Sequence, residues 1–134
     1  MAKRIVIVPC SGIGKPTGEI GRQAAYEVAY KLRPDQARME CLARLMLDDP
    51  ELVDLVKDNC VITLDGCPDD CARKNIERVG KEVDQVVHVG DLLLEHPDLV
   101  PQGILQMGDQ GWQLVNMLAE RIAAKVDELT AKED

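Results

Sequence analysis

The sequence predicts an α/β domain in which helices flank a small parallel sheet of three to four strands. Three short apolar segments, residues 4–8, 60–64 and 85–89, are rich in β-branched side chains and lack polar alternation, which indicates strands buried on both faces. Segments with helical periodicity separate these strands, as in the repeating units of parallel sheets. A chain of 134 residues suits one domain, so we expect residues 1–134 to form a single domain with only Lys132–Asp134 frayed.

The first predicted strand leads into the first predicted helix. Pro9 ends the strand, and a glycine-rich connection follows it. The helix carries apolar residues at steps of four, from Ile20 to Leu32. We expect it to end at Arg33, because the residue before a proline, here Pro34, avoids the helical region.

Two further helices are expected before the second strand. Residues 36–47 are assigned to one of them, in which Cys41 shares an apolar face with neighbouring leucines. Asp49 as N-cap and Pro50 at the first helical position then predict a third helix. This third helix is short and should end around Asp58.

The second strand is followed by a loop over residues 65–71. Asp69 or Asp70 is expected to cap a helix that reaches Val79. Gly80 is well placed to end this helix, because glycine readily takes the left-handed conformation found there. The third strand then completes the predicted sheet.

The carboxyl-terminal part of the chain contains one clear helix. Residues 90–108 include apolar side chains, but Pro97 and Pro101 interrupt any long element. The last helix begins near Asp109 and carries a stripe of apolar residues on one face. Trp112, near its start, is expected to anchor the helix in the core.

Composition excludes two classes of partner. The chain has 24 acidic and 16 basic residues, a formal net charge of -8, and only one Trp, two Tyr and no Phe. Phosphate backbones repel such a surface, and few rings are present to stack on bases, so we expect no nucleic-acid binding. No apolar run approaches the length of a membrane span. The apolar stretch after the basic N-terminus is too short for a signal-peptide core, and we expect a cytoplasmic protein.

The five cysteines indicate a metal site more than a disulfide framework, because their number is odd and no secretion signal precedes them. Cys10 follows the first strand and Cys67 follows the second. The carboxyl ends of parallel strands meet at one edge, where sites in such sheets form, so we expect these two thiols to be neighbours. Cys67 and Cys71 have a spacing that suits one zinc ion.

A closed tetrahedral zinc site needs a fourth ligand. Cys60 opens the second strand and should lie about 16 Å from the carboxyl edge, so a place in the core suits it better. Cys41 lies on a helix whose placement the sequence does not fix, and its spacing leaves both a ligand and a core role open. His88 ends the third strand at the same edge, although a lone strand histidine is more often structural.

Four stretches of the sequence resemble the DGC-domain family: Pro9-Cys10-Ser11-Gly12-x-Gly14-Lys15, Gly18-Glu19-Ile20-Gly21-Arg22, Cys41-Leu42-Ala43 and Asp65-Gly66-Cys67-Pro68-x-x-Cys71-Ala72. The family is named for the motif matched by Asp65-Gly66-Cys67 and is described as zinc-binding because of its four chelating cysteines. The resemblance implies that Cys10, Cys41, Cys67 and Cys71 bind the metal. It implies no particular activity.

We therefore expect a zinc-binding accessory protein with a four-cysteine site at the carboxyl edge of the sheet, whose protein partner, if it has one, the sequence does not identify. Two alternatives stay open. Four thiolates also hold iron–sulfur clusters. A thiol-based redox or sulfur-transfer enzyme would use Cys10 as nucleophile and Cys67 or Cys71 as resolving thiol. A phosphate-binding loop at residues 9–16 is disfavoured, because prolines occupy the positions that need glycine and a hydroxyl residue.

Overall fold

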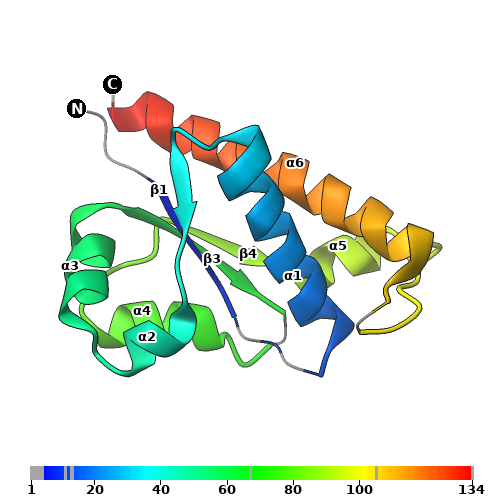
Figure 1. Ribbon diagram of the computed structural model, residues 1–134, viewed down its shortest axis with the longest axis horizontal. Helices are drawn as coiled ribbons and strands as arrows, with labels where there is room; N and C mark the ends of the chain where they lie inside the picture. The colour runs from blue at the N-terminus through cyan, green and yellow to red at the C-terminus, as the bar shows by residue number, and fades with distance from the viewer. Residues whose placement is uncertain (1–4, 11, 13, 67, 105, 134) are drawn as a thin grey trace.

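Four parallel strands form one sheet in the order β2-β1-β3-β4 (Figure 1). The computed structural model describes residues 5–10, 12, 14–66, 68–104 and 106–133. The strands are β1 (Ile5–Pro9), β2 (Ala37–Met39), β3 (Cys60–Asp65) and β4 (Gln85–His88). All four carboxyl ends therefore meet at one edge of the sheet. The predicted α/β class and small parallel sheet are confirmed.

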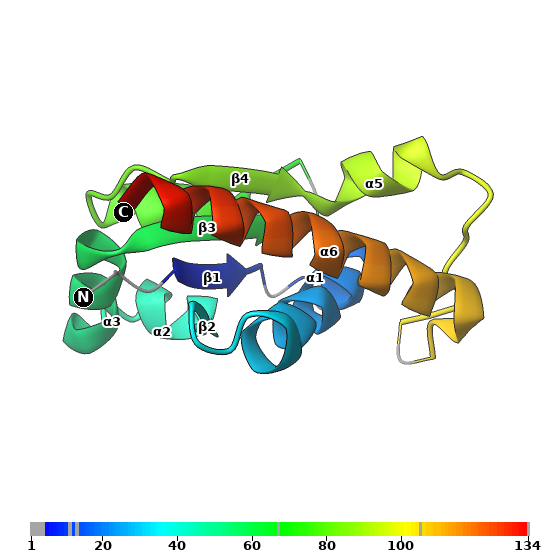
Figure 2. The same ribbon diagram turned by 90° about the horizontal axis from the view of Figure 1, so that it is seen from above.

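Helices cover both faces of this sheet. They are α1 (Pro16–Glu27), the π-helical turn η1 (Val28–Leu32), α2 (Leu42–Met46), α3 (Pro50–Asp58), α4 (Cys71–Arg78), α5 (Val89–Glu95) and α6 (Gly108–Glu133). Figure 1 shows α1 and α6 on one side of the strands and α2, α3 and α4 on the other. Figure 2 shows that α6 runs along the sheet and ends on the side where the strands begin.

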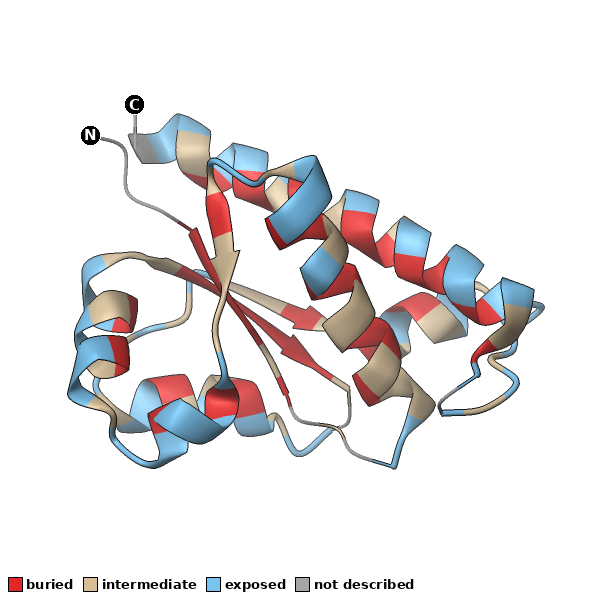
Figure 3. Ribbon diagram, in the orientation of Figure 1, coloured by how far each residue is buried: buried red, intermediate tan, exposed pale blue. Residues whose placement is uncertain are grey.

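The protein has two hydrophobic cores, one on each face of the sheet. In β1, Ile5 and Ile7 pack into the core formed with α1, η1, α5 and α6, while Val6 and Val8 pack into the core formed with α2, α3 and α4. Successive side chains of a strand point to opposite faces, so an unbroken apolar run is needed where both faces are covered. Figure 3 shows the resulting buried strands and inward helix faces.

The prediction of one helix over residues 36–47 is wrong. Ala37–Met39 instead forms the edge strand β2, and α2 contains only the five residues Leu42–Met46. Hydrogen bonds from the Ile5 amide to the Gln36 carbonyl and from the Glu40 amide to the Ile7 carbonyl frame the pairing of β2 with β1. Of the apolar face that suggested one helix, Leu42 and Leu45 are buried in α2, whereas Cys41 precedes that helix as its N-cap residue.

The predicted start of α3 and the predicted end of α4 agree with the structure. The Asp49 side chain accepts hydrogen bonds from the first amides of α3, as an N-cap residue does. Gly80 follows α4 with a φ of +92°, which confirms its role as a helix terminator. Residues 90–95, left without an element in the sequence, belong to α5.

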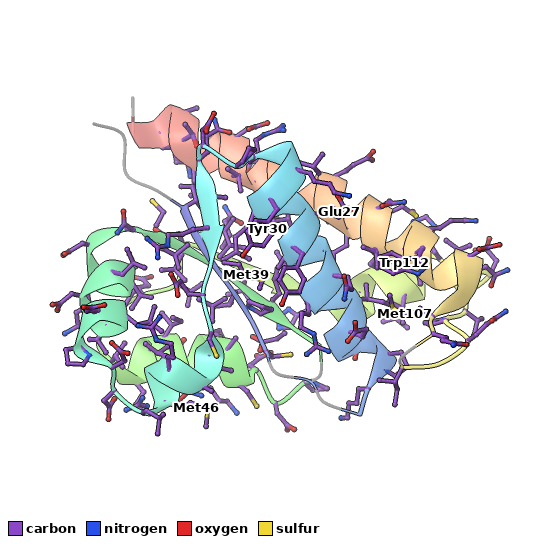
Figure 4. The ribbon with its side chains drawn as sticks, viewed as in Figure 1. Glu27, Tyr30, Met39, Met46, Met107 and Trp112 are labelled. Carbon is purple, nitrogen blue, oxygen red and sulfur yellow. The ribbon has the colours of Figure 1, made fainter. Side chains whose placement is uncertain are left out.

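Two expectations concern α6. Trp112, labelled in Figure 4, is 46% exposed, so its prediction as a core anchor is wrong. Leu114 and Leu118 take that place in the core. The helix continues through Lys132 to Glu133, into the stretch expected to fray, and Asp134 lies outside the described residues. Arg4, expected to open the first strand, also lies outside them.

Candidate metal centre

The carboxyl edge of the sheet brings together the segments that carry the candidate cysteines. Cys10 follows β1 directly, Cys41 comes two residues after β2, and Asp65 is the last residue of β3. Since these three strands are parallel neighbours, the segments that follow them lie at the same edge (Figure 1). Cys67 lies outside the described residues.

Cys10 is held against the Asp-Gly-Cys motif. Its side chain is buried, and its Sγ accepts a hydrogen bond of 3.2 Å from the Gly66 amide. Its own amide donates to the Leu64 carbonyl at 2.8 Å, which continues the pairing of β1 with β3. An amide donor favours a thiolate over a thiol, so this contact suits a metal ligand or a nucleophile.

Cys10 and Cys41 line one cavity of about 370 Å³. The exposed Cys41 is the N-cap residue of α2, which follows β2. The other lining residues are Pro9, Arg22, Tyr26, Met39, Glu40, Leu42 and Ala43, and Met39 is labelled in Figure 4. The missed strand β2 is therefore what brings Cys41 to the edge where Cys10 lies.

Cys71 opens α4, and Asp65 fixes that end of the helix. The Asp65 carboxylate is only 2% exposed and accepts hydrogen bonds from the amides of Ala72, at 2.8 Å, and Arg73, at 3.3 Å. Burial raises the pKa of Asp65, and the two amide hydrogen bonds oppose that rise. The first residue of the Asp-Gly-Cys motif thus docks α4, with the exposed Cys71, onto the end of β3.

The carboxylate of Asp70, the residue before Cys71, contacts two nitrogen donors. Its Oδ1 lies 2.7 Å from His88 Nε2, and its Oδ2 lies 3.1 Å from Arg73 Nη2. Burial raises the pKa of Asp70, but the hydrogen bonds from His88 and Arg73 outweigh it and leave the pKa below its usual range. His88 ends β4 at the predicted edge. Its pairing with Asp70 was not predicted, because it depends on the backbone conformation of a loop.

Close backbone packing joins the two cysteine loops to the start of α1. A Cβ on Gly66 would lie 3.1 Å from the Gly18 nitrogen and 3.1 Å from Thr17 Oγ1. A Cβ on Gly12, whose φ is +47°, would lie 2.5 Å from the Gly18 Cα. Glycine at these positions therefore allows the segments around Cys10 and the Asp-Gly-Cys motif to approach each other.

Cys60 lies at the opposite edge of the sheet from Cys10, as expected. It is the first residue of β3, at the amino edge of the sheet, and its half-buried side chain packs against the core shared with α1 and α6. Cys60 therefore offers a matched control for substitutions at the carboxyl edge.

The cysteine thiols at this edge are chemically suited to bind zinc. Cys10, Cys41 and Cys71 come from three separate segments at one edge, and thiolates are preferred zinc ligands. Among the described residues, which leave out Cys67, no three histidine, cysteine, aspartate or glutamate side chains are grouped closely enough to hold an ion. Among these thiols, Cys10 therefore lies near the Gly66 amide, and Cys71 lies at the N-terminus of α4.

A second cavity, of about 550 Å³, lies beside the residues that follow β3 and β4. It is lined by Asp65, Gly66, Pro68, Asp70, His88, Gly90, Asp91 and Leu94. The sequence places His88 at the same edge as the loop over residues 65–71, but it does not place Gly90, Asp91 and Leu94 there, since α5 was not recognised. The cavity exposes the Asp70–His88 pair on the flank of the loop.

Comparison with known proteins identifies the family. None of the helices in the described part of the chain has the length and apolar character needed to cross a membrane. No curated protein and no solved structure proves similar to the chain. The family model of the DGC domain matches residues 6–100, a stretch that includes Cys10, Cys41, Cys67 and Cys71. This match extends over well more than half of the sequence, and the chain belongs to the DGC domain family.

Proposed function

We propose that the protein is a zinc-binding accessory protein whose ion is held by Cys10, Cys41, Cys67 and Cys71. The observation that carries this proposal is the position of β2, which leads Cys41 to the carboxyl edge where Cys10 follows β1. Gly66, the residue before Cys67, contacts Cys10 Sγ, and Asp65 holds the helix that begins with Cys71. Each proposed ligand is thus adjacent in sequence to a segment of this edge.

Four thiolates leave no open position on a tetrahedral ion, which favours a structural role over a catalytic one. The proposed ligands join segments that follow three different strands and one that opens a helix. Metal binding by such distant segments contributes directly to folding free energy. Cys71 is the first residue of α4, and the partial positive charge of a helix N-terminus suits a negatively charged metal centre.

One observation supports a second candidate, a thiol-based redox or sulfur-transfer enzyme. Cys10 Sγ accepts the Gly66 amide hydrogen bond inside a cavity that Cys41 also lines. Such a thiolate would attack one sulfur of a substrate disulfide and displace the other as a thiolate. Cys67 or Cys71 would then attack Cys10 in the mixed disulfide, which releases the second substrate thiolate and leaves a protein disulfide. The same four thiolates would also suit an iron–sulfur cluster. Metal content separates these functions.

The test is elemental analysis of protein purified without oxygen or added metal. The proposal predicts about one zinc per chain. Cys41→Ser should lose most of this zinc, whereas Cys60→Ser should retain it, because Cys60 lies at the opposite edge. An iron content of about two or four atoms per chain would indicate an iron–sulfur cluster in place of zinc. A folded, metal-free protein would contradict the proposal and favour thiol chemistry at Cys10.

A further inference from the structure

We propose that His88 is a positioning residue for the cysteine centre, because it holds Asp70 in the backbone conformation that orients Cys71. This inference rests on the proposed function and assigns a role to a side chain outside the ligand set. The structural basis is the contact of 2.7 Å between His88 Nε2 and Asp70 Oδ1.

Asp70 has an unusual backbone and an unusual side-chain role. Its φ of 54° and ψ of 47° lie in the left-handed region, which few residues other than glycine adopt. It occupies the N-cap position of α4, yet its carboxylate makes no capping hydrogen bond to the helix. Asp65 supplies those bonds instead. The Asp70 carboxylate is therefore available to be held from outside the helix.

His88 supplies the link to the sheet. Asp70 also pairs with Arg73, but both residues belong to the same helix end, so that pair moves with the helix. His88 lies at the end of β4, opposite Asp65 in the pairing of β3 with β4. Because an ionised carboxylate has no proton to donate, His88 Nε2 is the donor in this hydrogen bond.

Cys71 lies between the two attachments. Asp70, on its amino side, is bound to His88 of β4, and Ala72, on its carboxyl side, donates its amide to Asp65 of β3. Both peptide neighbours of the proposed ligand are thus tied to adjacent strands. Removal of His88 leaves one attachment, so Cys71 keeps its helix but loses the constraint on its orientation.

Metal binding by full-length variants tests this role. We expect His88→Ala to weaken zinc affinity by about 10- to 100-fold, the effect of losing a group that orients a ligand. The S-to-Co²⁺ charge-transfer absorption should also fall in the cobalt-loaded variant, because fewer thiolates reach the ion. His88→Gln retains an amide donor and should restore most of the affinity and the absorption. His96→Ala removes the other histidine of the chain and should change neither.

A double-substitution cycle separates positioning from a general loss of stability. Glycine adopts the conformation of Asp70 without a side-chain constraint. In the Asp70→Gly background, His88→Ala should therefore cause no further loss of zinc affinity or of charge-transfer absorption. This comparison also holds if His88→Ala alone is too unstable to purify.

Three results would overturn the proposal. One is a His88→Ala variant that binds zinc as tightly as the wild type with undiminished thiolate absorption. Another is an additional loss on His88→Ala in the Asp70→Gly background, and a third is failure of His88→Gln to restore binding. In each case a zinc-binding wild type would leave the proposed function intact. Failure of the wild type to bind zinc or cobalt would instead overturn both proposals.

Discussion

Substitution of Asp65 tests how the Asp-Gly-Cys motif holds the fold together. Its carboxylate accepts two amide hydrogen bonds at the start of α4. In Asp65→Ala both amides lose their acceptor. The Ala72 amide belongs to a residue with no exposure, whereas Arg73 is partly exposed and water can replace its partner in part.

The expected magnitude follows from these contacts. A buried polar group left without a partner costs about 1–3 kcal/mol, and a partly hydrated one costs less, so the two amides together cost about 2–4 kcal/mol. Burial raises the pKa of Asp65, which means that the ionised carboxylate is itself disfavoured by its surroundings. Its removal relieves that cost, so we expect a net loss of about 2 kcal/mol in the free energy of unfolding.

Equilibrium urea unfolding at a fixed excess of zinc measures this loss as a lower transition midpoint with an unchanged slope. Asp65→Asn keeps one carbonyl oxygen for Ala72 and should cost about half as much. Asp98→Ala, at an exposed aspartate, is the matched control and should stay within about 0.5 kcal/mol of the wild type. Equal midpoints for Asp65→Ala and Asp98→Ala would refute the capping role.

Further predictions concern the glycine of the motif and an ion pair far from it. Gly66→Ala should destabilise the protein by about 1–3 kcal/mol, because its Cβ meets the start of α1, whereas Gly90→Ala has open space and should be neutral or stabilising in thermal unfolding. Equal effects of the two substitutions would contradict the close packing of the cysteine loops. A hydrogen bond from Arg33 lowers the pKa of Asp127 below the ordinary aspartate value of about 3.9. The stability that this pair contributes is therefore present above pH 4 and lost as the pH falls through the folded-state pKa, so Asp127→Asn should be less stable than the wild type at neutral pH and equal to it in acid. An Asp127 titration by NMR that gives an ordinary pKa would count against the pair.

The sequence predicts most of the sheet and misses its edge. The strands β1, β3 and β4 were recognisable because burial on both faces requires an unbroken apolar run. Ala37-Arg38-Met39 has no β-branched residue and forms only a three-residue edge strand, so nothing in its composition separates it from the neighbouring helix. Because the sequence does not reveal this strand, it does not place Cys41.

The candidate site, like the sheet, could be predicted only in part from the sequence. The carboxyl-edge position of Cys10 could be inferred from the order of strands and loops alone. The contact between Asp70 and His88 could not, because it requires both the register of β4 against β3 and a left-handed residue before α4. The prediction of Trp112 as a core anchor fails, because the stripe that includes Leu114 and Leu118 fills the core and leaves Trp112 exposed.

The proposed function requires that four cysteine sulfurs hold one zinc ion at the carboxyl edge. X-ray absorption at the zinc edge of the purified protein tests it most directly, since sulfur and nitrogen or oxygen ligands differ in distance and scattering. We expect four sulfur ligands at about 2.3 Å and no nitrogen or oxygen ligand. In Cys41→Ser, any zinc that remains should have three sulfur ligands, while Cys60→Ser should keep four. A wild-type spectrum with three or fewer sulfur ligands, or a Cys41→Ser spectrum that still shows four, would contradict it.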